Sequence, residues 1–127
     1  MKQTSFNGKH ILIADDEEYV RNHLAKRMDG MGLVVSQAGT GQEVLNLALD
    51  GPDLIIMDVK MPVLDGVETA RRLKTDNQTR DIPVVLLSAM AQQEEVDKGL
   101  ATGADEYVMK PVTFDRLMES VRRHLLG

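Results

Sequence analysis

The chain carries at residues 53–66 the sequence DLIIMDVKMPVLDG. Its apolar run at 54–57 is continuous, whereas a strand with one face in water would alternate apolar and polar side chains. The stretch therefore predicts a strand that is buried on both faces. Pro62 and the dipeptide Asp65-Gly66 then predict a loop before the next element.

The same pattern recurs along the whole chain. Short apolar runs alternate with segments whose apolar residues recur every three or four positions, which is the period of a helix. Proline and glycine residues separate the segments. Strands are predicted at 10–14, 33–35, 54–57, 84–87 and 107–109, and helices at about 20–31, 40–50, 67–73, 92–102 and 113–125.

Buried strands that alternate with helices require crossover connections, which produce a parallel sheet with helices on both faces. The predicted fold class is therefore α/β, with three layers. The sequence contains no linker or internal repeat, so its 127 residues are expected to form a single domain with a core of about residues 9–125. In such sheets the functional crevice lies outside the carboxyl ends of the strands.

The composition excludes several classes of protein. The longest apolar runs have four residues, whereas a membrane span needs about 20. The N-terminal residues lack the apolar stretch of a secretory signal, and the absence of cysteine excludes disulfides and thiolate metal sites. A net charge of −5 disfavours direct binding of nucleic acid. We therefore expect a cytoplasmic protein that does not bind membranes and whose partner is a protein or a small molecule.

Four of the five predicted strands end in a charged or hydroxyl side chain. The first ends in Asp15 and Asp16, the third in Asp58, the fourth in Ser88 and the fifth in Lys110. Three carboxylates repel one another in a partly buried crevice, and a cation relieves the repulsion. Because no histidine or cysteine lies near these strand ends, the oxygen ligands favour Mg²⁺, or Mn²⁺ in its place, over Zn²⁺.

A divalent ion and Lys110 beside Asp58 provide the arrangement that phosphoryl transfer needs, because the transition state spreads negative charge over three oxygens. Asp58 is then the predicted nucleophile, which forms an acyl phosphate. The Ser88 hydroxyl is expected to hydrogen-bond one phosphoryl oxygen, and Lys110 to pair with another.

The residues at the strand ends also carry a resemblance to a known family. The motifs are ILIADDE at 11–17, DLIIMDVKMP at 53–62, LSA at 87–89 and GADEYVMKP at 103–111. They resemble the receiver domain of bacterial two-component response regulators, and of chemotaxis regulators in particular, over about residues 9–125. The resemblance implies a flavodoxin-like three-layer sandwich with strand order 2-1-3-4-5 and five helices on both faces.

The resemblance also implies a role for each matching residue. Asp58 would accept a phosphoryl group from a sensor histidine kinase or a histidine phosphotransfer protein. Asp15, Asp16 and Asp58 would hold Mg²⁺ together with the backbone carbonyl of Lys60, and Asp16 is favoured over Asp15 as a direct ligand. Ser88 matches the switch hydroxyl, Tyr107 the switch aromatic, and Lys110 the phosphate-binding lysine, whose bond to Pro111 is often cis in the family.

A phosphoryl group on Asp58 would then draw Ser88 inward and let Tyr107 rotate from an exposed to a buried position. This would alter the surface formed by the fourth helix, the fifth strand and the fifth helix, where the resemblance places partner binding. The surface is suited to a downstream target, an output domain or a second copy of the chain. Its expected charged residues are Asp97, Lys98, Asp105, Glu106 and Arg122.

Two other functions are weighed against this one. Phosphohydrolases that use Mg²⁺ and an aspartyl nucleophile typically place a second aspartate two residues later, where this chain has Lys60, and no segment is inserted as a cap. A flavin-binding module is disfavoured because Tyr107 is the one aromatic residue near a strand end. We therefore predict a phosphoacceptor switch that assists its own phosphorylation and dephosphorylation and is not an enzyme.

Several points stay open at this stage. Taken alone, Asp15 and Asp16 fit an acidic first turn of a helix, and Tyr107 fits ordinary half-buried packing. The three histidines, at 10, 23 and 124, have no paired spacing, so surface positions are expected for them. The sequence does not name the kinase, the stimulus, the output or the phosphoryl lifetime, nor does it distinguish a complete single-domain regulator from the receiver of a longer protein.

Overall fold

A computed structural model describes residues 6–90 and 92–126, so the predicted domain ends at 1 and 127 lie outside the described part. Within that part, five strands alternate with five helices. The strands are β1 (His10–Ala14), β2 (Val34–Ala38), β3 (Leu54–Asp58), β4 (Val84–Ser88) and β5 (Glu106–Met109). The helices are α1 (Glu18–Asp29), α2 (Gly41–Ala48), α3 (Gly66–Thr75), α4 (Gln93–Leu100) and α5 (Phe114–Leu125).

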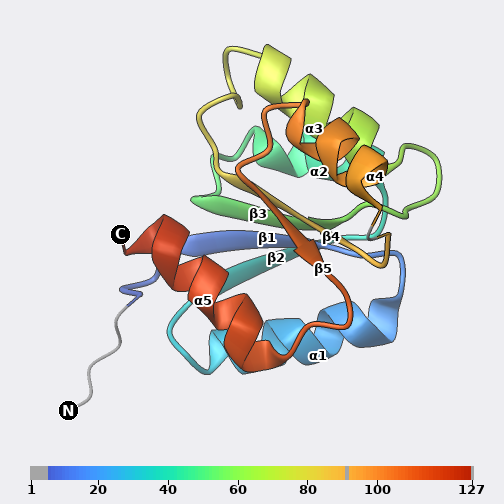
Figure 1. Cartoon of the computed structure of the whole chain (residues 1–127). Helices are drawn as coiled ribbons and strands as arrows, with labels where there is room; N and C mark the ends of the chain where they lie inside the picture. The colour runs from blue at the N-terminus through green and yellow to red at the C-terminus, as the bar shows by residue number, and fades with distance from the viewer. Residues whose placement is uncertain (1–5, 91, 127) are drawn as a thin grey trace.

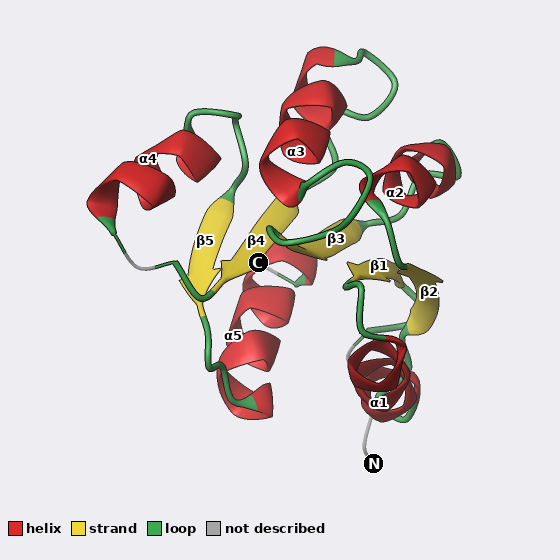
Figure 2. Ribbon diagram, turned by 90° about the vertical axis from the view of Figure 1, so that its right-hand side faces the viewer, coloured by secondary structure: helices red, strands yellow, loops and turns green. Residues whose placement is uncertain are grey.

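The strands of the described part form one parallel sheet in the order β2-β1-β3-β4-β5. Figure 2 views the sheet nearly end-on and shows this order across the molecule. Helices α2, α3 and α4 cover one face, and α1 and α5 cover the other (Figure 1). The predicted α/β fold class, its three layers and the strand order are therefore confirmed.

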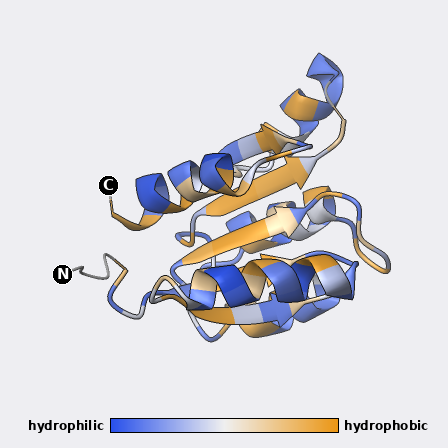
Figure 3. Cartoon of the chain, turned by 90° about the horizontal axis from the view of Figure 1, so that it is seen from below, coloured by the Kyte–Doolittle hydropathy of each residue, from blue (hydrophilic) through white to orange (hydrophobic). Residues whose placement is uncertain are grey.

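Each face of the sheet has its own apolar core. Successive residues of a strand point to opposite faces, so Ile55 and Met57 pack under α2 and α3, whereas Leu54 and Ile56 pack under α5. All five residues of β3 are buried. The continuous apolar run at 54–57 is thus explained by a central strand covered on both sides. None of the described helices combines the length and the apolar character that crossing a membrane requires (Figure 3).

Several predicted element boundaries differ from the structure by two or more residues, and three of the differences have a clear physical cause. Strand β2 extends through Ser36 and Gln37 to Ala38, because an edge strand is less covered and tolerates polar side chains. Helix α1 begins at Glu18, before its apolar stripe, since acidic residues are stable in a first helical turn. Helix α4 ends at Leu100, before the predicted end, and the chain then turns through Gly103.

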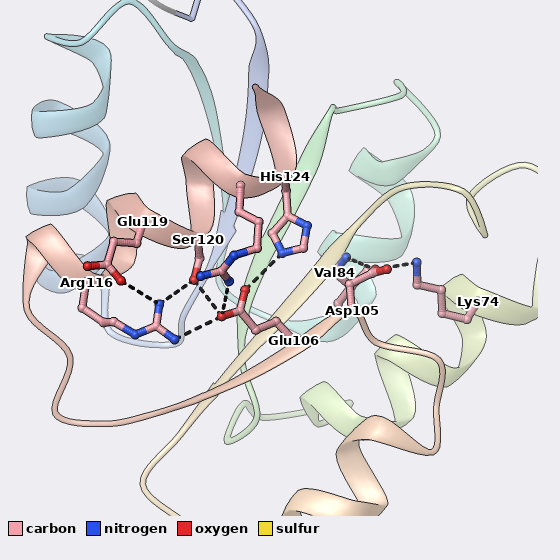
Figure 4. A network of polar contacts seen from close by, with 9 residues as sticks. Lys74, Val84, Asp105, Glu106, Arg116, Glu119, Ser120 and His124 are labelled. Carbon is pink, nitrogen blue, oxygen red and sulfur yellow. Dashed lines mark hydrogen bonds and ion pairs between the residues drawn. The ribbon is translucent and has the colours of Figure 1, made fainter. Parts of the chain in front are cut away.

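The start of β5 is tied to α5 by a partly buried charge network around Glu106. Its carboxylate accepts hydrogen bonds from Arg116 (3.1 Å) and Ser120 (3.0 Å) and pairs with Arg123 (2.8 Å) and His124 (3.1 Å), as Figure 4 shows in part. Burial alone would raise the pKa of Glu106, but the hydrogen bonds from these four side chains lower it to about 2.

This network corrects one expectation from the sequence. Glu106 and His124 are not surface residues, because each side chain is only 15% exposed and each is the other's partner. The Asp105 side chain is 39% exposed, as expected, and its carboxylate accepts hydrogen bonds from the Val84 backbone N–H and from Lys74. Glu106 is covered because the basic residues of α5 surround its carboxylate at the start of β5.

We expect Glu106→Gln to lower the free energy of unfolding at neutral pH by about 1 kcal/mol, because charge-assisted hydrogen bonds are lost. The folded-state pKa of Glu106 lies below its unfolded value. Its contribution is therefore present above the unfolded pKa and disappears as the pH falls from about 5 to 2. Urea unfolding of both proteins across this range should show their difference shrinking.

The matched control is Glu119→Gln, because the Glu119 side chain is 62% exposed and lies 3.9 Å from Arg116. It should leave stability almost unchanged at every pH. If the difference in the free energy of unfolding between wild type and Glu106→Gln stays constant down to pH 2, the lowered pKa of Glu106 is contradicted.

Candidate functional site

The carboxyl ends of β1, β3 and β5 bring the predicted charged residues to one edge of the sheet. Oxygen atoms from the carboxylates of Asp15, Asp16 and Asp58 all lie within 4.8 Å of one another. Asp15 and Asp58 are buried, whereas Asp16 is exposed. The three carboxylates therefore form a cluster with one side open to solvent.

Lys110 is the cation that this cluster holds in the structure. Its Nζ donates to Oδ2 of Asp58 at 2.8 Å and lies 3.8 Å from Oδ2 of Asp15. The other Asp58 oxygen, Oδ1, accepts from the backbone N–H of Lys60 at 3.3 Å. The peptide bond between Lys110 and Pro111 is cis, which agrees with the expectation from the sequence resemblance.

The pKa shifts at the site agree with this crowding of charge. Burial raises the pKa of the Asp15 carboxyl, and the negative charges of Asp58 and Asp16 raise it further, against the hydrogen bond from the Glu17 N–H. Burial alone would lower the pKa of Lys110, but its ion pair with Asp58 raises it. One ammonium group faces three carboxylates, so the cluster favours an additional cation.

A cavity of about 140 Å³ adjoins Asp58, and its other lining residues are Lys60, Ser88, Ala89, Met90 and Lys110. The Ser88 hydroxyl is 3% exposed and accepts a hydrogen bond from the Met90 N–H at 2.9 Å. Its own proton is therefore free to point toward a group bound at Asp58. The volume leaves room for a group larger than one water molecule.

Tyr107 is not part of this cavity. Its ring is half-buried, and its hydroxyl donates to the Met90 carbonyl at 2.9 Å. The Met90 peptide units thus link Ser88 to Tyr107. The expected rotation of Tyr107 from an exposed to a buried position stays a prediction.

Two functional neighbours were missed by the sequence reasoning. Met90 acts through its backbone N–H and carbonyl, for which residue type gives no signal. The guanidinium of Arg21, in the first turns of α1, donates to the Asp15 carbonyl at 2.7 Å and so supports the acidic loop. Arg21 follows Asp16 by five residues, which is close enough for its side chain to reach back to the acidic loop. The sequence did not predict this contact, because a charged residue on a helix is more often solvated.

A second cavity, of about 480 Å³, lies between α1 and the start of α5 and meets the site at Asp15 and Lys110. Its wall includes His23, Phe114 and Arg27, whose guanidinium lies 3.8 Å from the centre of the Phe114 ring. The site therefore opens toward a groove along α1.

Comparison with known proteins decides the family. A model of the response regulator receiver domain matches residues 11–122, which is most of the chain. The chain belongs to this family. It is a phosphoacceptor module of two-component signalling, and the resemblance noted in the sequence is confirmed.

Individual relatives support this membership. The phosphate regulon transcriptional regulatory protein PhoB of Pseudomonas aeruginosa is 40% identical over 105 residues, which cover 82% of this chain and 46% of that protein. The receiver chain therefore spans about half the length of the curated relatives that it matches.

Two solved structures are informative about the site. The receiver domain of the sensor histidine kinase PA1611 from Pseudomonas aeruginosa, with magnesium coordinated in its active-site cleft, has a TM-score of 0.85, 26% identity and coverage of 94% and 99% of the two chains. The complex of Saccharomyces cerevisiae Ypd1, a histidine phosphotransfer protein, with the receiver domain of Ssk1 matches with a TM-score of 0.85 and 25% identity, covering 95% of this chain and 91% of that one.

Lys110→Met tests the ion pair at the centre of this receiver site. The change leaves the mostly buried Asp58 carboxylate without its partner, so we expect the free energy of unfolding to fall by about 1–3 kcal/mol. In an Asp58→Asn background the same change should lower stability by less, because the 2.8 Å pair with Asp58 is already lost and the 3.8 Å contact with Asp15 is the one that remains to be broken. Urea unfolding of the four proteins measures this difference.

Lys98→Met is the matched control, since the Lys98 side chain is 62% exposed and lies 3.9 Å from Glu95. It should change stability by less than about 0.5 kcal/mol. If Lys110→Met lowers the free energy of unfolding equally in the wild-type and Asp58→Asn backgrounds, the two side chains are not coupled.

Proposed function

We propose that this receiver domain, over about residues 9–125, accepts a phosphoryl group on Asp58. The observation that carries the proposal is the position of the Asp58 carboxylate. It is mostly buried at the end of the central strand, borders a cavity, and has a lysine ammonium 2.8 Å away. An anionic nucleophile with a cation beside it is what transfer of a negatively charged group requires.

The reaction is a transfer between two phosphoryl acceptors. An oxygen of Asp58 attacks the phosphorus atom, the bond from phosphorus to the donor breaks, and the donor leaves with the bonding electron pair. The product is an acyl phosphate. Lys110 is placed to compensate the negative charge of one phosphoryl oxygen, and the Ser88 hydroxyl, which already accepts from Met90, can donate to another.

The carboxylate cluster has the donor set for a hard divalent ion. Asp15, Asp16 and Asp58 offer oxygens within 4.8 Å of one another, with one side open to solvent, and the Lys60 carbonyl is proposed as a further ligand. Such an arrangement suits Mg²⁺, which keeps several waters, and Mn²⁺ accepts the same donors. When bound, the ion would neutralise negative charge on the phosphoryl oxygens.

The domain acts in this proposal as a switch and not as an enzyme that releases a metabolite. It assists its own phosphorylation and dephosphorylation, and its product is an altered surface that includes Tyr107. The donor is a sensor histidine kinase or a histidine phosphotransfer protein, the class of partner seen with the Ssk1 receiver. The cytoplasmic location, and a downstream target, an output domain or a homodimer through the α4, β5 and α5 face, belong to the same proposal.

Acetyl phosphate tests the phosphorylation site directly. With Mg²⁺ present, intact-mass spectrometry should show one phosphoryl adduct on the wild type and none on Asp58→Asn. Asp81→Asn, which changes an exposed aspartate outside the site, should be labelled like the wild type. Retention of the adduct in Asp58→Asn would refute the assignment, and repeated turnover of acetyl phosphate without an adduct would indicate a phosphohydrolase.

Thermal unfolding tests the metal ligands. At a Mg²⁺ concentration of about 100 times Kd, binding should stabilise the wild type by about 2.7 kcal/mol. Asp16→Asn should unfold at a higher temperature than the wild type without Mg²⁺, because carboxylate repulsion is reduced, and should gain much less from Mg²⁺.

Asp50→Asn, an exposed change outside the cluster, serves as the control and should respond to Mg²⁺ like the wild type. Equal stabilisation of Asp16→Asn and wild type would argue against direct ligation by Asp16.

A further inference from the structure

Helix α4 rests on the sheet through a glycine. Of its eight residues, all of them described, Gly99 is the one that is fully buried. The residue that precedes the helix, Gln92, makes no side-chain capping bond. Glycine is a poor residue for a helix interior, so its presence at the buried contact calls for a reason in the packing.

The reason lies in the ring of Tyr107. A methyl group added to Gly99 would lie 2.7 Å from Cδ2 and 2.9 Å from Cε2 of that ring, closer than carbon atoms can approach. On another side it would lie 3.3 Å from Cδ1 of Leu86. The Tyr107 ring therefore occupies the space that any side chain at this position of α4 would need.

The ring is also held at its far end. Its hydroxyl donates to the carbonyl of Met90, and the N–H of Met90 donates to the hydroxyl of Ser88, each at 2.9 Å. A continuous set of contacts thus runs from the backbone of Gly99 through Tyr107 and Met90 to Ser88, which lines the cavity beside Asp58.

We propose that Gly99 is a positioning residue for Tyr107. The missing side chain lets the ring lie against the backbone of α4 while its hydroxyl reaches Met90, and so joins the placement of α4 to the loop that follows Ser88. The proposed function is needed only for the further claim that this contact helps α4 to respond to phosphorylation. The contact itself can be tested without any phosphodonor.

The consequence of a side chain at Gly99 follows from the space around the ring. Leu86 is the neighbour of Tyr107 on β4 and belongs to the apolar core against which Tyr107 packs, so the ring has little room to move toward the sheet. The hydroxyl of Tyr107 makes its hydrogen bond to Met90 at an exposed position. In Gly99→Ala we therefore expect the ring to turn outward into solvent and to lose its hydrogen bond with Met90.

The composition of the chain makes this change easy to observe. Tyrosines are present only at positions 19 and 107, and tryptophan is absent. Protein labelled with 3-fluorotyrosine should give two fluorine NMR signals, and Tyr19→Phe assigns them. Because Tyr19 is 83% exposed, its signal marks the environment of a solvated ring. In Gly99→Ala the Tyr107 signal should move toward that position and become more sensitive to a soluble paramagnetic quencher.

Gly30→Ala is the matched control. Gly30 follows α1 with helical backbone angles, and an added methyl group would have its nearest contact at 3.5 Å, an ordinary distance. This variant should leave the Tyr107 signal where it is in the wild type. An unchanged Tyr107 signal in Gly99→Ala would overturn the proposal.

Thermal unfolding in a Tyr107→Ala background gives the second measurement, and it also covers the case in which Gly99→Ala alone does not fold. With the ring removed, Gly99→Ala should raise the unfolding midpoint, because alanine favours a helix more than glycine does. With the ring present, the same change should lower it. An equal loss of stability in both backgrounds would refute the role of the ring. Labelling by acetyl phosphate is scored separately, so failure of this contact is distinguishable from failure of Asp58 phosphorylation.

Discussion

The ion pair between Lys110 and Asp58 is the contact on which the site depends. Asp58 ends a strand that is covered on both faces, so its carboxylate lies where an unpaired charge would be costly. Because β4 lies between β3 and β5, Lys110 reaches across the end of β4 to make the pair. The contact thus joins the end of β3 to the loop after β5, and the cavity that Ser88 lines lies beside it.

The two helices beside that cavity, α5 and α4, differ in how firmly they are attached to the sheet. Helix α5 buries five residues and is tied to β5 by the carboxylate of Glu106. Helix α4 buries Gly99 and touches the Tyr107 ring there. If Ser88 moves as proposed, α4 is therefore expected to resist the movement less than α5. This difference in anchoring supports the proposed change in the α4, β5 and α5 face.

The elements that could be predicted closely are those with simple surroundings. Strands β1 and β3 are covered on both faces, so their continuous apolar runs marked them to within one residue. Strand β2 lies at the sheet edge, where Ser36 has a polar partner in His10, and its apolar pattern ended too early. Helix boundaries also escaped the pattern where the helix is polar, as at Glu18.

The sequence by itself determined the parallel fold and the meeting of Asp15, Asp16, Asp58, Ser88 and Lys110 at one edge, because both follow from the order of buried strands and helices. Only the tertiary structure decided which groups these residues and their neighbours contact. The partners of Glu106, the Met90 peptide between Ser88 and Tyr107, and the space at Gly99 all join different elements. Such contacts depend on how each helix is rotated and spaced against the sheet, and the periodicity of a single segment carries no information about that.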